Sequence, residues 1–343
     1  MSNPVLTRAI DDLAYGRHLS ADHAAAVLRE VMDGQASEVE IGAFLIALRT
    51  KGETVDEVEG LARTMRELAL PVRASRRPLV DTAGTGGGRP TFNVSTTAAF
   101  VAAAAGCAVA KHGNRSATGR SGSADVLEAL GARIDLSPEA VAECIDSLGF
   151  GFMFAPAHHA AMKHVVPVRR ALAVRTIFNL LGPLTNPAGA TRHLIGISEL
   201  AYLETMAAAL GRLGVERALV VSGEDGLDEV SASGPTKAVE LREGRLEAVT
   251  VTPEELGVEP IGHDDLGACE PEQSAACARA VLAGAPGPER SIVVMNAAAA
   301  IYLGDGADSL EAGARAAERT IDSGAASQLL DRFVERTREL APA

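Results

Sequence analysis

The sequence predicts an α/β fold in two domains, with a small all-helical N-terminal domain followed by a larger α/β domain on a mainly parallel central sheet. The chain has 343 residues, 47% of them apolar, and single cores stop growing near ~250–300 residues. Residues 5–70 show helical patterns alone, whereas short apolar runs alternate with helical patterns after Pro78, as in parallel-sheet proteins. We therefore expect a helical domain at 1–71 and an α/β domain at 72–343.

The helical part has recognisable start and stop signals. Ser20 is a candidate N-cap for a helix that ends near Gly34, and Thr54 to Glu57 form a capping box that opens a helix stopped by Pro71. Between these helices an apolar stripe recurs at helical spacing, formed by Ile41, Phe44, Leu45 and Leu48. A small helical unit with such a stripe needs a partner surface.

The α/β part begins after Pro78. Its strand candidates are the short apolar runs Leu79–Val80, Cys107–Ala110, Arg217–Val221 and Ser291–Met295. Ser137 and Pro138 start a helix, and residues 237–252 alternate around Glu243 and Gly244 as in a hairpin. A second capping box, from Thr252 to Glu255, follows the hairpin.

Composition excludes several classes of function. A net charge of -13 argues against an extended nucleic-acid surface, and 3% aromatic residues with no Trp argue against a stacking platform for single strands. The four cysteines, which form no C-x-x-C pair, favour free buried thiols: Cys107, Cys144, Cys269 and Cys277. The N-terminus lacks a signal sequence, and no apolar run reaches ~18 residues, so we expect a cytoplasmic protein.

A glycine-rich stretch from Asp81 to Thr96 follows the first strand candidate. It contains Gly84, Gly86, Gly87 and Gly88 and ends in hydroxyl and amide side chains. Glycines let backbone N–H groups converge on an anion, and a helix that opens just afterwards adds its positive end. The stretch matches neither a Walker loop nor the dinucleotide spacing, so a phosphate loop and a structural strand-to-helix turn are both open on these residues alone.

A second candidate anion loop runs from Lys111 to Asp125, after the strand candidate at 107–110. Ser121 and Ser123 stand just before an expected helix at 124–130, where hydroxyls and backbone amides could hold a phosphate while Asp125 favours the helix start. A solvated loop with an N-cap is the alternative. Ligands of open parallel sheets bind beyond the carboxyl ends of strands, so the two loops could share one ligand.

The carboxylates Asp225, Asp228 and Glu229 follow the strand candidate at 217–221. Adjacent carboxylates are hard oxygen ligands that Mg²⁺ accepts alongside substrate phosphates. Acid pairs at strand ends are also common as solvated turns. A diphosphate loop elsewhere in the same domain favours the magnesium interpretation.

A basic cluster lies between Ala155 and Arg175 in this otherwise acidic chain. Its histidines lack the ligand spacing of a zinc site. Arginine is the better candidate for function, because its planar fork pairs with a carboxylate. Most of the cluster could equally be surface cations. Its members are His158, His159, Lys163, His164, Arg169, Arg170 and Arg175.

Taken together and in order, six blocks of the chain resemble the anthranilate phosphoribosyltransferase family. The longest block is the most specific, and the resemblance spans nearly the whole chain. The blocks are Gly84-Thr-Gly-Gly87, Thr91-Phe-Asn-Val-Ser-Thr96, Lys111-His-Gly-Asn-Arg115, Ser121-Gly-Ser-Ala-Asp125, Arg175-Thr-Ile-Phe-Asn-Leu-Leu-Gly-Pro-Leu-Thr-Asn-Pro187 and Asp225-Gly-Leu-Asp-Glu229.

The resemblance implies a nucleoside phosphorylase/phosphoribosyltransferase-like fold, in which part of about 160–185 returns to the helical domain. It also implies a homodimer formed through the helical domains. The implied reaction belongs to tryptophan biosynthesis: anthranilate and phosphoribosyl diphosphate give N-(5-phosphoribosyl)anthranilate and diphosphate with Mg²⁺.

By position, the resemblance assigns magnesium to Ser95, Asp228 and Glu229 and anthranilate to Asn114 and Arg169, with Arg169 on the carboxylate. No single side chain is expected to be an indispensable acid or base, because positioning and the metal can carry the reaction. The expected substrate-binding residues are Gly84, Gly87, Gly88, Thr91, Asn93, Val94, Ser95, Thr96, Lys111, His112, Gly113, Asn114, Arg115, Ser116, Ala117, Thr118, Gly119, Ser123 and Arg169.

The chain departs from the family pattern at residues 88–90. The family commonly has an acid after Gly-Thr-Gly-Gly, whereas this chain has Gly88, Arg89 and Pro90 in a loop that is one residue shorter. The change puts in doubt any metal or ribose contact made by that acid.

Two other functions remain open. A pyrimidine nucleoside phosphorylase shares the fold but takes free phosphate, and the long block at 175–187 favours the transferase. A non-catalytic ligand-binding regulator on the same scaffold is the second alternative, although Arg169, Asp228 and Glu229 are all present.

Overall fold

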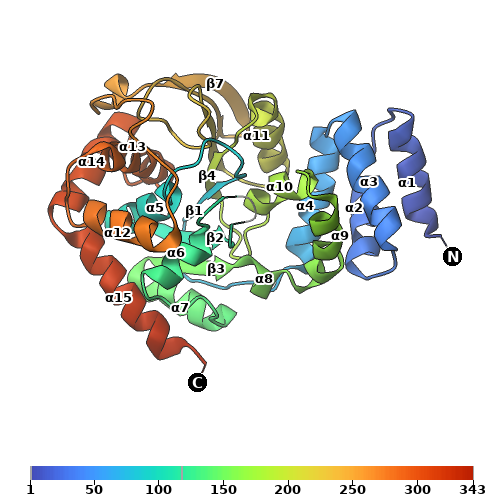
Figure 1. Cartoon of the computed structure of the whole chain (residues 1–343), viewed down its shortest axis with the longest axis horizontal. Helices are drawn as coiled ribbons and strands as arrows, with labels where there is room; N and C mark the ends of the chain where they lie inside the picture. The colour runs from blue at the N-terminus through green and yellow to red at the C-terminus, as the bar shows by residue number, and fades with distance from the viewer. Residues whose placement is uncertain (1, 117–118, 343) are drawn as a thin grey trace.

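The computed structural model describes residues 2–116 and 119–342. It has a helical N-terminal part at one end and an α/β part at the other, with the two termini far apart (Figure 1). Among the described residues, no helix is long and apolar enough to cross a membrane. The fold predicted from the sequence is confirmed.

Four helices form the N-terminal part, and side-chain caps begin each of them. Asn3 caps α1, Ser20 caps α2, and capping boxes at Ser37 and Thr54 open α3 and α4. The predicted stripe Ile41, Phe44, Leu45 and Leu48 is buried in α3. The four helices are α1 (Pro4–Ala14), α2 (Ala21–Met32), α3 (Glu38–Lys51) and α4 (Val55–Leu68).

A seven-stranded sheet in the order β3-β2-β1-β4-β5-β6-β7 forms the centre of the α/β part. The first five strands in this order are parallel, and β6 and β7 are the predicted hairpin, which pairs antiparallel to β5. The strands are β1 (Leu79–Gly84), β2 (Ala108–Gly113), β3 (Phe150–Phe154), β4 (Arg192–Gly196), β5 (Arg217–Gly223), β6 (Thr236–Arg242) and β7 (Arg245–Val251).

One predicted strand is wrong. Residues 291–295 lie inside α13 (Pro288–Leu303), a helix in which every residue from Ile292 onward is buried. A helix that is apolar all round shows no amphipathic period, so its short β-branched run is indistinguishable from a buried strand.

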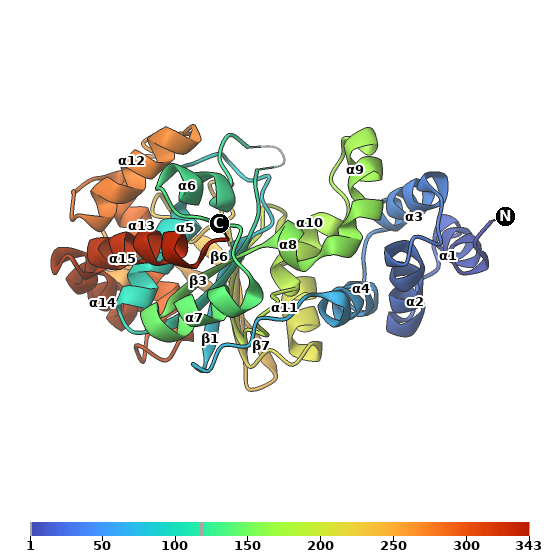
Figure 2. The same ribbon diagram turned by 90° about the horizontal axis from the view of Figure 1, so that it is seen from below.

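Helices cover both faces of the sheet (Figures 1 and 2). Helices α5 (Val94–Ala104) and α6 (Ser123–Ala129) follow the two phosphate-loop candidates, and α12 (Pro271–Leu282) packs on both. Helix α7 (Pro138–Leu148) packs against β3. The C-terminal helices are α14 (Leu310–Asp322) and α15 (Ala325–Leu340). The helices between β3 and β5 are α8 (Ala155–His158), α9 (Val166–Leu172), α10 (Ile177–Leu181) and α11 (Leu203–Arg212). Short 3₁₀ turns are η1 (Ala160–His164), η2 (Gly182–Leu184), η3 (Leu200–Tyr202) and η4 (Glu254–Leu256).

Two apolar cores lie on opposite faces of the sheet, and β5 contributes alternate residues to each. Leu219 and Val221 join the core under α5 and α13, whereas Ala218 and Val220 join the core shared with α1 to α4. This alternation follows from the period of two along a strand. The core of the N-terminal helices is therefore continuous with one face of the sheet.

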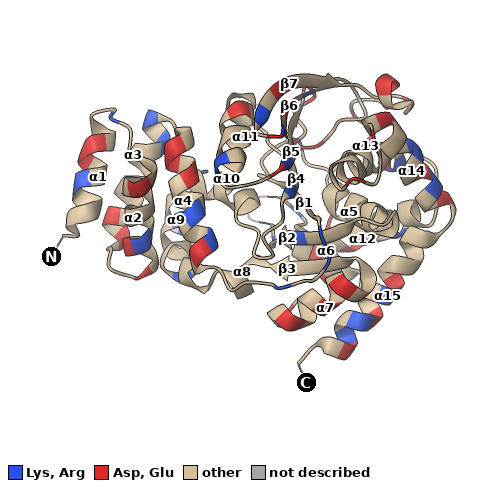
Figure 3. Cartoon of the chain, turned by 180° about the vertical axis from the view of Figure 1, so that it is seen from behind, with Lys and Arg blue, Asp and Glu red and all other residues tan. Residues whose placement is uncertain are grey.

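The segment containing α9 and α10 packs against the N-terminal helices, α9 on α3 and α10 on α4 (Figure 2). Val165 and Val168 are buried in the core of those helices. Charged residues cover the peripheral helices at both ends of the molecule (Figure 3). All four cysteines are free, with Cys107 and Cys144 buried as expected and Cys269 and Cys277 only half-buried.

Candidate active site

The glycine-rich stretch and the acid pair meet at the carboxyl edge of the sheet. The stretch leaves β1 at Gly84, and the turn that holds Asp228 and Glu229 leaves β5 at Gly223. The Gly86 N–H donates to Asp228 Oδ2 at 2.9 Å. Segments more than 130 residues apart therefore form one site, which agrees with the rule for ligands of parallel sheets.

Close packing explains why glycines are needed in this loop. Gly86 and Gly87 have φ of 66° and 86°, which side chains rarely adopt. A Cβ at Gly87 would lie 1.9 Å from Arg175 Nη1, and one at Gly88 would lie 2.7 Å from Asp228 Oδ1. Position 88 therefore has no room for a side chain in this chain unless Asp228 or the Gly226 carbonyl moves.

Lys111 is buried beneath the two loops. Its Nζ donates to the Thr82 carbonyl, and it lies 3.2 Å from Thr82 Oγ1 and 3.3 Å from Ser95 Oγ. Burial lowers the pKa of Lys111, while the nearby Asp81 and Glu229 act in the opposite direction. Lys111 is thus a buried amine shared between the glycine-rich stretch and the acid pair.

The acid pair has the chemistry of a magnesium site. Burial, and then the neighbouring Asp228, raise the pKa of Glu229 to about 8, and burial raises that of Asp228. Two adjacent buried carboxylates whose ionised forms are disfavoured suit a hard divalent cation. Among residues 2–116 and 119–342 no group of three His, Cys, Asp or Glu side chains could hold a metal, and Mg²⁺ normally takes one or two carboxylates plus substrate phosphates and water.

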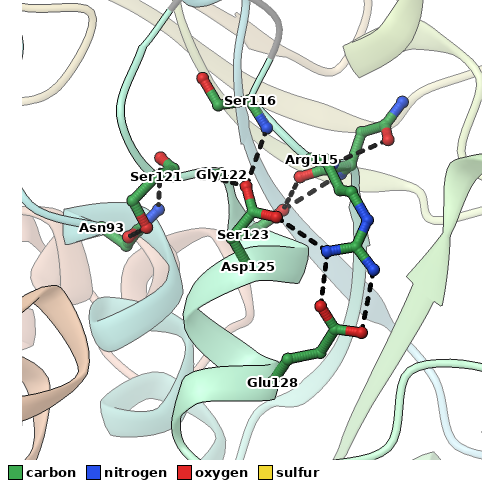
Figure 4. Close-up of polar contacts among 9 residues, drawn as sticks. Asn93, Arg115, Ser116, Ser121, Gly122, Ser123, Asp125 and Glu128 are labelled. Atoms are coloured by element: carbon green, nitrogen blue, oxygen red, sulfur yellow. Dashed lines mark hydrogen bonds and ion pairs between the residues drawn. The ribbon is translucent and has the colours of Figure 1, made fainter. Parts of the chain in front are cut away.

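A hydrogen-bond network organises the second loop (Figure 4). Asp125 Oδ2 accepts from Ser116 N at 3.0 Å and from Gly122 N at 2.9 Å, so Asp125 holds the start of α6 as expected. The Arg115 guanidinium pairs with Asp125 and Glu128. Its charge is therefore neutralised by this chain. The predicted residues Ala117 and Thr118 lie outside the described residues.

Asn93 links the glycine-rich stretch to the second loop and to α12. Its Oδ1 accepts from Ser121 Oγ and from Ser274 Oγ, both at 2.7 Å (the Ser121 contact is in Figure 4). The side chain therefore does not cap α5, although Asn93 stands at its N-cap position. Ser274 is fully buried in α12, and nothing in its sequence surroundings marks it as part of a site.

The other predicted site residues lie around the same two loops. Thr91 Oγ1 donates to the Phe92 carbonyl at 2.9 Å, and Val94 begins α5. Thr96 Oγ1 is buried without a hydrogen-bond partner. The Asn114 N–H donates to Ser123 Oγ at 3.2 Å, while Gly113 packs against that hydroxyl and Gly119 against Ser116 Oγ.

A pocket of about 490 Å³ opens beside Lys111 and reaches the N-terminal helices. It joins β2 residues to α9 and α10. Its lining includes Met65, His112, Asn114, His159, Lys163, Arg169, Phe178 and Gly182.

The pocket wall contains two neutral histidines. Burial lowers the pKa of His112 to about 3 and that of His159 to about 4. Their ring centroids are 5.2 Å apart, and the Nε2 atoms of both are buried without a partner among residues 2–116 and 119–342. His112 Nδ1 lies 3.2 Å from the Gly182 carbonyl, so Nδ1 carries the proton and Nε2 is free to accept a hydrogen bond.

Of the basic cluster, His159, Lys163 and Arg169 reach this pocket. The half-buried Arg169 guanidinium lies 5.6 Å from the centroid of Phe178, and burial lowers its pKa. His158 instead holds the Leu70 carbonyl through Nδ1 at 2.9 Å. Arg175 donates to the Gly86 carbonyl at 2.6 Å, a role in the glycine-rich loop that the sequence did not indicate. Arg170 is exposed.

The fold, together with the two loops and the pocket beside them, is that of a glycosyl transferase. Residues 7–69 match the model of the glycosyl transferase family helical bundle domain, and residues 76–327 match that of its a/b domain. The chain is 51% identical to the anthranilate phosphoribosyltransferase of Moorella thermoacetica over 331 residues, 96% of this chain and 98% of the relative.

Solved structures agree with this match. The anthranilate phosphoribosyltransferase of Thermus thermophilus is 47% identical, with a TM-score of 0.91 over 96% of this chain and 99% of its own. The Saccharomyces cerevisiae enzyme in complex with PRPP and Mg is 27% identical, with a TM-score of 0.88 over 99% of each chain. This chain belongs to the anthranilate phosphoribosyltransferase family.

Proposed function

We propose that this protein transfers the 5-phosphoribosyl group of phosphoribosyl diphosphate to the amine of anthranilate, with release of diphosphate, as a step of tryptophan biosynthesis. The observation that carries the proposal is that two unlike groups of residues, the loops around Lys111 and the pocket lined by His112, adjoin at β2. Lys111 belongs to the diphosphate and metal side, and the next residue, His112, lines the pocket that contains Arg169. Two substrates bound there would meet at one strand end.

On the diphosphate side, we propose that the backbone amides of residues 84–88, the α5 terminus and the Lys111–Ser123 loop hold phosphoribosyl diphosphate. Gly residues and helix N-termini present N–H groups to phosphates. Ser95, Asp228 and Glu229 hold Mg²⁺, which neutralises charge on the departing diphosphate. The other substrate residues expected from the resemblance belong to the same two loops, where Arg115 and Ser116 shape the second loop through their bonds to Glu128 and Asp125.

On the acceptor side, Arg169 pairs with the carboxylate of anthranilate and Asn114 contacts the substrate from the loop that follows β2. An aromatic amine is neutral at pH 7, so its lone pair is available without a strong base. The neutral His112 and His159 fit this role, since neither adds positive charge next to the amine. Rate enhancement then comes from orienting the amine opposite the leaving diphosphate.

The two lobes would have distinct roles. We propose a helical domain at 1–71, joined by part of 160–185, and a phosphoribosyl diphosphate-binding domain at 72–343. A homodimer through the helical domains is supported by apolar side chains exposed on α1 and α3, Tyr15 and Val39 being 73% and 81% exposed. Light scattering of the purified protein tests the dimer. The proposed location of the protein is the cytoplasm.

Loss of anthranilate fluorescence tests the activity. The signal should fall when enzyme, phosphoribosyl diphosphate and Mg²⁺ are all present. It should stay constant when any one of the three is left out. An unchanged signal under all conditions would overturn the proposal. A pyrimidine nucleoside phosphorylase would instead release a nucleobase from a nucleoside with free phosphate, and a regulator would bind ligands without turnover.

A further inference from the structure

Arg89, which follows the sterically restricted Gly88, reaches from the glycine-rich loop to the turn that bears the acid pair. Its backbone N–H donates to the Gly226 carbonyl at 2.8 Å, and its Nη2 lies 3.3 Å from Asp225 Oδ2. Its Nη1 donates to the carbonyl of His263. The Arg89 side chain is only 19% exposed. One arginine therefore joins three segments of the α/β part.

Asp225 is the anchor at the other end of this contact. Its Oδ2 also accepts from Ser231 Oγ at 2.7 Å and Ser233 Oγ at 2.5 Å, and its Oδ1 accepts from Leu227 N at 3.2 Å. The Asp225 side chain is 7% exposed. Its burial opposes ionisation, yet the serine hydroxyls, Leu227 and Arg89 hold its pKa below the ordinary value. Asp225 is thus an ionised side chain that its hydrogen bonds hold in one position.

The turn between Asp225 and the acid pair is short and closed on itself. Gly226 N donates to the Gly223 carbonyl at 3.0 Å, and Gly223 N donates to the Leu227 carbonyl at 2.8 Å. Fixing Asp225 therefore fixes the backbone that leads directly into Asp228. On the opposite side, Gly86 N holds Asp228 Oδ2, and Gly88 packs against Asp228. The glycine-rich loop therefore contacts both ends of this turn, Asp225 through Arg89 and Asp228 through Gly86.

We propose that Arg89 is a positioning residue that locks the turn 225–229 against the glycine-rich loop and thereby sets the affinity for the divalent cation bound with phosphoribosyl diphosphate. The inference rests on the proposed function. Arg89 does not touch the substrate or metal, because its charge is directed to Asp225. In a chain that lacks the family's acid at position 88, this clamp orients the two carboxylates that are present.

The test compares Arg89→Ala with Arg290→Ala as a matched control. Arg290 has a side chain 20% exposed and likewise binds one carboxylate, Asp322, and one backbone carbonyl, that of Gly284. It lies in α13, outside the proposed site. Arg89→Lys and Asp225→Asn complete the set.

Binding of Mn²⁺ by electron paramagnetic resonance, with phosphoribosyl diphosphate present and its protein-free signal subtracted, gives the metal affinity. Loss of a residue that orients metal ligands typically weakens metal binding by about 10–100-fold, and this range is expected for Arg89→Ala. Arg89→Lys should give a smaller loss, because the ammonium keeps the ion pair with Asp225. Some loss remains because one ammonium cannot bridge Asp225 and the His263 carbonyl. Arg290→Ala should match the wild type. The anthranilate KM at saturating metal should stay within about twofold.

Amide hydrogen exchange of the ligand-free protein supplies a second readout. Arg89→Ala should speed exchange at residues 223–230, where local opening becomes easier, and Arg290→Ala should not. Arg89→Ala and Asp225→Asn should be strongly non-additive in metal affinity, because they break the same contact. If Arg89→Ala does not fold, Arg89→Lys takes its place in the metal-binding measurement and in the double variant with Asp225→Asn.

An Arg89→Ala protein that binds Mn²⁺ within twofold of the wild type would overturn the inference, as would additive effects in the double variant. A wild-type protein that binds no Mn²⁺ with phosphoribosyl diphosphate would overturn the proposed function instead. The two failures are thus distinguishable in one experiment.

Discussion

Arg169 brings a half-buried guanidinium to the pocket wall, where burial already disfavours its charge. A carboxylate bound opposite it would stabilise the charged guanidinium through a charge-assisted hydrogen bond, worth ~1.5–3 kcal/mol. We expect Arg169→Ala to raise the anthranilate KM by about tenfold to a hundredfold and to leave the KM for phosphoribosyl diphosphate nearly unchanged. Steady-state kinetics with each substrate varied in turn measures both constants.

The matched control for this prediction is Arg170→Ala. Arg170 is the next residue of α9, but its side chain is exposed. The control should keep both KM values near those of the wild type. Equal increases in the two constants for Arg169→Ala would show that it disturbs the whole site and does not recognise the carboxylate.

At the residue scale, the sequence located the segments of the site better than the direction of individual side chains. Lys111 lies near the end of β2 and Asp228 follows β5, so their place at the sheet edge could be predicted from local pattern. Arg115 also follows a strand, yet it turns to Glu128, which α6 places on the same side as Asp125. Ser274 and the contact of Arg89 with Asp225 depend on packing between distant segments, which no local spacing encodes.

At the element scale, caps made the helices predictable, and packing decided the cases without caps. The Ser20, Thr54 and Ser137 side chains each accept a hydrogen bond from an amide of the first turn. These are the same residues that predicted the helix starts from the sequence. The capping box at Thr252 also forms, but only the single turn η4 follows it. Residues 291–295 had no side-chain cap, and burial on all sides hid their helical period.

Gly60 shows how one residue sets the distance between two helices. It lies in α4, and a Cβ there would be 2.0 Å from the Ala21 carbonyl oxygen at the start of α2. Alanine normally stabilises a helix relative to glycine by up to ~1 kcal/mol, but here the helices must move apart. We expect Gly60→Ala to lower the free energy of unfolding by about 1–3 kcal/mol, measured by urea denaturation.

Gly42 is the control for this prediction because it also lies inside a helix, α3, but has space. A Cβ there would meet Val168 Cγ1 at 3.7 Å, an ordinary contact. Gly42→Ala should leave stability unchanged or raise it by up to about 1 kcal/mol. A Gly60→Ala protein as stable as Gly42→Ala would show that α2 and α4 do not need this close approach.

At the scale of the whole molecule, the sequence predicted two parts but not how they are joined. Arg66 of α4 makes this connection: its Nε donates to the Leu184 carbonyl at 2.6 Å and its Nη1 to the Leu213 carbonyl at 3.0 Å. Arg49 of α3 donates to the Arg175 carbonyl at 2.8 Å, and Arg175 in turn holds Gly86. Such arginine-to-carbonyl contacts leave no pattern in the sequence, because the acceptors are backbone atoms.

The connection between the two parts buries His193 of β4 beside Arg66. Its Nε2 lies 2.8 Å from the Ala190 carbonyl, and its Nδ1 has no partner. Burial, and then the nearby Arg66, lower the pKa of His193 to about 3. In the unfolded chain a histidine titrates near ~6.5. The stabilising effect of this difference is complete above ~6.5 and is lost as the pH falls toward about 3, because the unfolded chain then binds a proton that the folded protein excludes.

We therefore expect the unfolding free energy of the wild type to contain a His193 contribution that falls by about 2 kcal/mol between about pH 7.5 and about pH 5. In His193→Gln this contribution is absent, so the stability difference between the two pH values should shift by that amount relative to the wild type. The comparison with the wild type is essential, because Asp81, whose pKa is raised to about 6 mainly by burial, acts in the opposite direction over the same range. Urea denaturation of both proteins at the two pH values measures the shift, and His263→Gln, an exposed histidine, should not reproduce it. Equal differences in wild type and His193→Gln would mean that His193 takes up its proton without unfolding, and that the junction between the helical and α/β parts opens to water at low pH.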